Sequence, residues 1–312
     1  MSDMLKGWTE DHSDRFQKEI LSFQHGLKDT GLFTDEALIA LLNKHPHNML
    51  DVCTMGNVDC ELYPNRFQTG DFRGVDGKIL LEAAKAGKVW INIRRGMNLH
   101  PEYKDVLDQM YGGIAEKTGN KAYNANGGIL ISSPIAQVPY HFDKTETILW
   151  HVRGKKSMYL YPLTEKFIPD SAYEATLLNE LEDDLPYRPE YDEEATIFDF
   201  EEGQALSWPL NMPHRVDNQT FCVSVTTEYS TRESGMKNAA MIANATLRHR
   251  LGIESSYTKA GPINRQLKSI FGRVIRKAGL AAKVDIVDMV TFKVDPSAPD
   301  YLVNVEPYQR NF

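Results

Sequence analysis

Residues 138–162 read VPYHFDKTETILWHVRGKKSMYLYP. In this run of strand-forming residues, His141 and Asp143 flank Phe142. Because side chains at positions i and i+2 of a strand point the same way, the pattern predicts an imidazole and a carboxylate on one face, with Phe142 facing the opposite layer. Burying two polar groups in the interior of a narrow barrel is costly unless something pairs with them. A bound metal ion is the expected partner.

Short strand-like segments surround this run from about residue 121 to residue 230. They are rich in β-branched and aromatic residues, and Gly, Pro or Asn turns separate them. Many short antiparallel strands in one block predict a jelly roll or a small barrel. An acidic stretch at about 170–194 interrupts the block and is expected to lie outside the barrel as a helical insertion. The predicted fold class is a mainly β core, of the jelly-roll or cupin type, with flanking N- and C-terminal α-helices.

The residue pattern changes near residues 121 and 233, and these changes predict three regions. Residues 1–120 are expected to form a helical or mixed region that packs on the core, residues 121–232 the β core, and residues 233–312 a C-terminal helical region. Apolar residues spaced three or four apart predict a helix over residues 11–28. These residues are Phe16, Ile20, Phe23 and Leu27.

Composition excludes several classes of protein. A net charge of −8 argues against a nucleic-acid binder, since phosphate contacts need a basic surface. The sequence has no apolar run long enough to span a bilayer and no signal-peptide pattern at its start, so we expect no membrane association and a cytoplasmic location. Three cysteines are too few for a disulfide framework.

A third ligand for the expected metal should come from another strand, and the leading candidate is His214, which follows a strand and a proline-containing turn. Two histidines and one carboxylate leave further coordination positions open, as in non-haem Fe(II) oxygenases. Lys156 lies 15 residues after His141, where a strand–turn–strand connection can return its ammonium over the metal. The cosubstrate 2-oxoglutarate needs such a cation for its distal carboxylate, together with a hydroxyl donor, for which Thr147 is the candidate.

The combined pattern resembles the JmjC/cupin-like branch of Fe(II)/2-oxoglutarate-dependent oxygenases, and most closely its asparaginyl-hydroxylase-like members. Those proteins show an HxD motif, then Gly-x-Lys and a strand that ends in proline, and later a histidine eleven residues after a glycine. The matching positions of this chain, over roughly residues 120–230, are His141, Asp143, Gly154, Lys156, Pro162, Gly203, Pro209 and His214. Gln204 departs from the family's usual aspartate, and the family's tyrosine that helps hold 2-oxoglutarate cannot be placed; Tyr123 and Asn126 are the candidates.

The resemblance implies a double-stranded β-helix with Fe(II) held by His141, Asp143 and His214, and 2-oxoglutarate held by Lys156 with help from Thr147. It also implies an enzyme that uses O₂ to couple decarboxylation of 2-oxoglutarate to hydroxylation of a protein side chain or a small molecule. A cupin enzyme of another type and a non-catalytic regulator that binds a metal or ligand are the alternatives.

The C-terminal helices are a frequent place of self-association in this branch, so the resemblance favours either a docking surface or a homodimer interface there. In this chain residues 264–279 carry an apolar stripe suited to such contact, although packing onto the barrel explains the stripe equally well.

Overall fold

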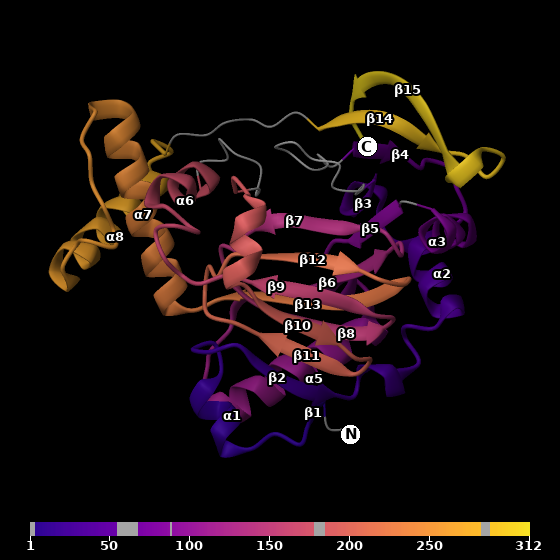
Figure 1. Cartoon of the computed structure of the whole chain (residues 1–312), viewed down its shortest axis with the longest axis horizontal. Helices are drawn as coiled ribbons and strands as arrows, with labels where there is room; N and C mark the ends of the chain where they lie inside the picture. Colours follow the sequence, from indigo (N-terminus) through magenta and orange to yellow (C-terminus); the bar gives the residue numbers. More distant parts are fainter. Residues whose placement is uncertain (1–3, 55–67, 88, 178–184, 282–287) are drawn as a thin grey trace.

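The computed structural model describes residues 4–54, 68–87, 89–177, 185–281 and 288–312. Within these residues, two β-sheets face each other and helices lie around them (Figure 1). A helical pair, α7 and α8, lies at one side of the molecule, and the C-terminal hairpin of β14 and β15 lies at the opposite side (Figure 1). None of the helices in the described residues is long and apolar enough to cross a membrane.

The larger sheet has eleven strands in the described part of the chain. In spatial order they are β1 (Leu5–Lys6), β2 (Leu21–His25), β11 (Gln204–Ser207), β8 (Glu146–Arg153), β13 (Cys222–Ser230), β6 (Tyr123–Ser132), β5 (Val89–Ile93), β3 (Leu50–Thr54), β4 (Gln68–Asp71), β14 (Met289–Val294) and β15 (Leu302–Gln309). Neighbouring strands run antiparallel except β4 and β14, which are parallel.

The smaller sheet has four antiparallel strands in the order β10 (Thr196–Phe200), β9 (Lys156–Leu160), β12 (His214–Asn218) and β7 (Gln137–His141). Leu149 and Leu206 of the larger sheet and Met158 and Val216 of the smaller one belong to a single buried apolar cluster. This cluster lies between the two sheets, so the strands form the predicted double-stranded β-helix. The predicted fold class, a β core with flanking helices, is confirmed.

Eight α-helices flank the sheets in the residues that the structure describes. They are α1 (Glu10–Arg15), α2 (Asp35–Lys44), α3 (Gly77–Ala86), α4 (Gly96–Leu99), α5 (Pro101–Thr118), α6 (Asp170–Leu177), α7 (Arg232–Leu251) and α8 (Pro262–Lys277). Short 3₁₀ turns are η1 (Leu27–Thr30), η2 (His47–Met49), η3 (Pro189–Glu194) and η4 (Pro299–Tyr301). Local signals set several helix ends: the Thr34 hydroxyl accepts the amide N–H of Ala37 at the start of α2, and Gly119, at φ 70°, ends α5.

The helix predicted over residues 11–28 is wrong beyond Arg15. Gln17 adopts a left-handed conformation (φ 60°), and residues 21–25 form β2, which pairs with β11. Leu21, Phe23 and His25 are buried on one side of this strand. Burial along residues 21–25 alternates with a period of two, as in a strand. Pairing with β11, about 180 residues later in the sequence, makes this segment a strand and not a helix.

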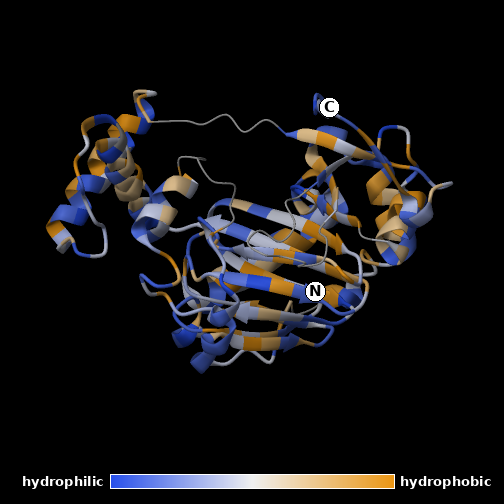
Figure 2. Ribbon diagram, turned by 45° about the horizontal axis from the view of Figure 1, so that its top comes forward, coloured by the Kyte–Doolittle hydropathy of each residue, from blue (hydrophilic) through white to orange (hydrophobic). Residues whose placement is uncertain are grey.

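Residues 170–194 contain α6 and η3, while residues 178–184, which carry much of the insertion's acidity, lie outside the described residues. The prediction of helices after residue 233 holds for α7 and α8 but is wrong for residues 289–309. There β14 and β15 form a hairpin that joins the larger sheet through β4. Both apolar and charged residues are visible along the α7–α8 pair (Figure 2).

Candidate metal centre

The HxD segment lies at the end of β7. The strand ends at His141, so Asp143 belongs to the loop that leads into β8 and not to the strand itself. Phe142 is buried on the outer side of the smaller sheet, with its ring 4.8 Å from that of Tyr173. Its neighbours point the other way, so the predicted alternation of side chains holds even though the strand is shorter than expected.

His214 begins β12 and lies directly opposite His141 in the register of the smaller sheet. The centroids of the two imidazole rings are 4.2 Å apart, and His214 Nε2 is 3.7 Å from Asp143 Oδ2. Potential ligand atoms of all three residues lie within 4.8 Å of one another. The structure therefore brings together three side chains that the sequence places up to 73 residues apart.

Backbone carbonyls fix the protonation of both imidazoles. Nδ1 of His141 is 2.8 Å from the carbonyl oxygen of Pro139, and Nδ1 of His214 is 2.9 Å from that of Met212. Because a carbonyl oxygen only accepts, Nδ1 is the nitrogen that carries the hydrogen in the neutral form of each ring, and in that tautomer Nε2 is the nitrogen that can bind a metal. Burial, followed by the neighbouring His141, holds the pKa of His214 well below its usual value.

This donor set fits a divalent transition metal. Neutral imidazoles with an N–H bonded to a carbonyl are the form in which histidine binds metals. Two such nitrogens and one carboxylate are the facial set typical of non-haem Fe(II), and they leave other positions open.

Asn211 connects the two segments that carry the three side chains, and the sequence analysis missed it. It lies in the turn before β12, is almost fully buried, and its Nδ2 donates to the carbonyl oxygen of Asp143 at 2.7 Å. Its backbone is left-handed, with φ 65°. Asparagine tolerates this conformation better than most residues. An asparagine between Pro209 and Pro213 was therefore the signal in the sequence that could have indicated a left-handed turn before His214.

Lys156 begins β9 and is 3% exposed. In the smaller sheet Leu160 lies opposite His214, so Lys156 is four residues, about 13 Å, further along the strand. Burial lowers the pKa of its ammonium, with a smaller opposing effect from Cys222, and within the described residues Lys156 forms no salt bridge. A buried cation without a carboxylate beside it is costly, and an anionic ligand would offset that cost.

His151 is a second buried group near Lys156. It is fully buried on β8, where Nε2 donates to the carbonyl oxygen of Gly154 at 2.8 Å and the Ser224 hydroxyl donates to Nδ1 at 3.2 Å. Burial, and then the charge of Lys156, lowers the pKa of His151 to about 3. The imidazole is therefore neutral, and it fixes the turn that precedes the lysine.

Thr147 and Asn126 lie on the two strands that flank β13. In the register of the sheet, Glu228 of β13 lies opposite Asn126 on one side and opposite Thr147 on the other. Thr147 shares a face of β8 with Leu149, and Asn126 shares a face of β6 with Leu130; both leucines contact the cluster between the sheets. The two predicted polar residues therefore point toward the barrel interior.

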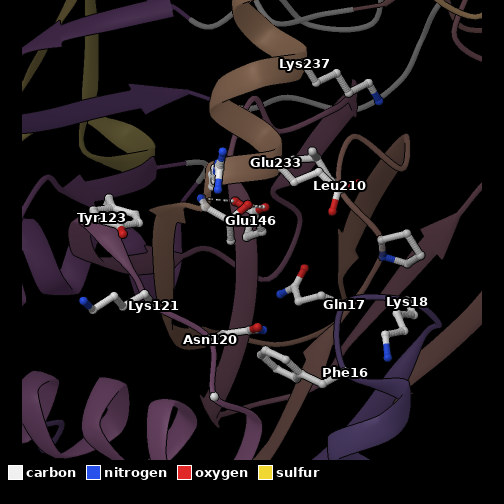
Figure 3. A pocket seen from close by; sticks show the side chains of 14 residues that line it. Phe16, Gln17, Lys18, Asn120, Lys121, Tyr123, Glu146, Leu210, Glu233 and Lys237 are labelled. Carbon is white, nitrogen blue, oxygen red and sulfur yellow. Dashed lines mark hydrogen bonds between the residues drawn. The ribbon is translucent and has the colours of Figure 1, made fainter. Parts of the chain in front are cut away.

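Tyr123 lies elsewhere. It is 51% exposed and lines a cavity of about 530 Å³ beside the barrel (Figure 3). None of the three clustered residues, His141, Asp143 and His214, is among the residues that line this cavity.

No model of a protein family matches the sequence, and no curated protein sequence matches it. Among solved structures, the chain is similar to YcfD of E. coli, with 15% sequence identity and a TM-score of 0.51 over 89% of this chain and 70% of that one. Two other structures of E. coli YcfD are described as a ribosomal oxygenase in complex with cobalt and 2-oxoglutarate or succinic acid. They match at 13% and 12% identity with TM-scores of 0.49 and 0.48, over 89% and 88% of this chain and 69% and 68% of theirs. The resemblance to JmjC/cupin-like oxygenases is thereby confirmed at the level of the fold: this chain has the fold of YcfD.

Proposed function

We propose that the protein is an Fe(II)- and 2-oxoglutarate-dependent oxygenase. The observation that carries the proposal is the convergence of His141, Asp143 and His214 at one end of a barrel whose interior also contains the buried Lys156. The proposal rests on this chain's own side chains.

Each side chain has a role in this proposal. Nε2 of His141, Nε2 of His214 and the carboxylate of Asp143 hold the iron. Lys156 pairs with the distal carboxylate of 2-oxoglutarate, and the inward-facing hydroxyl of Thr147 is placed to donate to the cosubstrate. Asn126, on the other side of Glu228, is a further polar contact for it, whereas Tyr123 would have to reach the cosubstrate from the cavity rim.

When bound, iron and 2-oxoglutarate would supply the oxidising chemistry: 2-oxoglutarate, O₂ and a substrate with a C–H bond would give succinate, CO₂ and a substrate with a C–OH group in place of that C–H bond. The chain's own contribution is placement. The carbonyls of Pro139 and Met212 orient the two imidazoles, and Asn211 holds the loop of Asp143. The apolar cluster between the sheets excludes water from the space between Lys156 and the metal ligands.

The test is anaerobic mixing of the protein with Fe(II) and 2-oxoglutarate. We expect a visible charge-transfer absorption band, and we expect Lys156→Ala to weaken 2-oxoglutarate binding by about 100-fold, since a buried charge pair is lost. The matched control is Lys155→Ala, which removes the exposed neighbouring lysine and should leave the band and its affinity unchanged. A cupin enzyme of another type, or a regulator without turnover, should show no band, and that result would refute the proposal.

We further propose that a second copy of the chain covers α8. The face of α8 that packs on α7 is made of Ser269, Gly272 and Ile275. At Gly272 the helices are so close that an added Cβ would lie 1.7 Å from the carbonyl oxygen of Ala239.

The opposite face of α8 carries its large apolar side chains, which are between 45% and 76% exposed. They are Ile263, Leu267, Ile270, Phe271 and Val274. Such a stripe amounts to roughly 500 Å², as large as the largest apolar patches of monomers. Two copies meeting through it would bury about 1,000 Å², which reaches the lower range of specific interfaces.

A further inference from the structure

The residues that line the cavity beside the barrel are chain neighbours or hydrogen-bond partners of residues at the proposed iron site. Leu210 lines it and immediately precedes Asn211, whose side chain holds the carbonyl of Asp143. Gln17 lines it from the other side and donates to the carbonyl oxygen of Thr147 at 3.3 Å. Glu146, also in the lining, is three residues from Asp143, so their Cα atoms are at most about 11 Å apart.

The lining of the cavity carries an excess of positive charge in a protein whose net charge is −8. Its charged side chains are Lys18, Lys121, Arg232, Lys237, Glu146 and Glu233. In Figure 3, Lys121 lies on one side of the cavity, with Lys18 and Lys237 on the other. Within the described residues, none of these four cations forms a salt bridge.

One of the two carboxylates is already engaged. Glu146 is buried and accepts hydrogen bonds from the backbone N–H and hydroxyl of Thr231 and from the hydroxyl of Ser234, at 3.2, 2.6 and 2.8 Å. It therefore caps the N-terminus of α7, whose helix dipole favours negative charge there. Glu233 is then the one acidic side chain in the lining that is not part of this cap, against four cationic side chains in the same lining.

Backbone strain also gathers around the cavity. Six non-glycine residues in the described part of the chain have positive φ. Three of them line the cavity or adjoin a lining residue: Gln17 at 60°, Asn124 at 54° next to Tyr123, and Asn211 at 65° next to Leu210. A left-handed residue costs roughly 1–2 kcal/mol, and such strain tends to be kept at binding sites.

We propose that this cavity binds a carboxylate group of the primary substrate and so presents an adjacent C–H bond to the metal. The inference rests on the proposed oxygenase function and names its substrate class: an acid, either as an acidic side chain of a peptide or as a free carboxylic acid. Lys121 and Arg232 form the exposed entrance, and charge-assisted hydrogen bonds to a carboxylate are among the stronger polar contacts. Phe16, Leu210 and Tyr123 supply apolar walls for the rest of the substrate.

The experiment measures binding to the metal-free full-length protein by calorimetry, so it does not depend on turnover. The probes are citrate, a hexaglutamate peptide and a hexalysine peptide, and a Lys156→Ala background removes the buried lysine as a competing anion site. Charge reversal by Lys121→Glu together with Arg232→Glu changes two exposed positions. The control is Lys259→Glu with Lys293→Glu, two exposed lysines outside the cavity lining, with the same net charge.

We expect at least one anionic probe to bind, the cavity variant to weaken that binding at least tenfold, and the control variant to leave it unchanged. Binding of hexaglutamate alone would identify a peptide as the source of the carboxylate, and binding of citrate alone a small acid. The inference is overturned if neither anion binds, if the two variants weaken binding equally, or if hexalysine competes at the same site. The iron–2-oxoglutarate band should survive in the cavity variant; its absence from the wild type would refute the oxygenase function and leave the anion-binding result standing.

Discussion

Replacing Asn211 tests how the metal ligands are held. Its side-chain amide donates a hydrogen bond that connects the turn before His214 to the loop of Asp143. Its backbone is left-handed. Asn211→Gly keeps the backbone conformation and removes the amide. Asn211→Ala removes the amide and also introduces a left-handed alanine. The two variants therefore separate the hydrogen bond from the backbone strain.

The expected losses of stability and of metal affinity follow from the hydrogen bond and the backbone strain. Losing the hydrogen bond should lower the free energy of unfolding by about 1 kcal/mol, and a left-handed alanine should lower it by a further 1–2 kcal/mol or so. For metal binding only the hydrogen bond matters, because it orients Asp143. Loss of such a supporting contact weakens metal affinity by about 10- to 100-fold, and we expect this for both variants.

The assay is titration of the metal-free protein with Co(II), an oxygen-stable substitute for Fe(II), followed by calorimetry and visible absorption. Asn124→Ala is the matched control, since Asn124 is also left-handed but is exposed. It should lose stability without losing cobalt affinity. If Asn211→Gly binds cobalt as tightly as the wild type, the contact does not hold Asp143 and the reasoning is wrong.

Three further predictions concern the fold and its assembly. Burial lowers the pKa of His25 to about 4, so as the pH falls below 6.5 the unfolded chain binds a proton here before the folded chain does. The free energy of unfolding should therefore fall by about 2 kcal/mol through this group between pH 6.5 and pH 5. Urea unfolding at the two pH values should show that the His25→Gln variant lacks this loss. At Gly154, with φ 94°, an added Cβ would lie 2.1 Å from the carbonyl oxygen of Phe221, so Gly154→Ala should lower the thermal midpoint by several degrees and weaken 2-oxoglutarate binding through Lys156. Finally, Leu267→Glu should convert the proposed dimer to a monomer in light scattering with its circular dichroism unchanged; a monomeric wild type would contradict the α8 interface.

The proximity of His141 and Asp143 could be predicted from the sequence because it follows from a local rule. The spacing of His141 and Asp143 is a two-residue pattern, and Lys156 is one strand and one turn away. His214 was a candidate because it follows a strand and a proline-containing turn, and the motif resemblance added the eleven-residue step from Gly203. Asn211 escaped notice because its role depends on a hydrogen bond across 68 residues.

The elements predicted wrongly are those whose structure is decided by distant partners. Residues 21–25 carry apolar spacings that suit either a helix or a strand, and pairing with β11 selects the strand. Residues 289–294 become a strand through a parallel pairing with β4, more than 200 residues earlier. Neither partner can be deduced from periodicity within a single window.

The register of the smaller sheet explains how the two imidazoles come to face the same point. His214 lies opposite His141 and Val216 opposite Val138, so two steps along β12 correspond to three along β7. The extra residue is a bulge, and it contains Pro139, which has no N–H to lose from the ladder. The bulge turns Tyr140 outward while His141 points inward, and it presents the Pro139 carbonyl to Nδ1 of His141. One inserted residue in a short strand therefore sets both the direction and the tautomer of a proposed metal ligand.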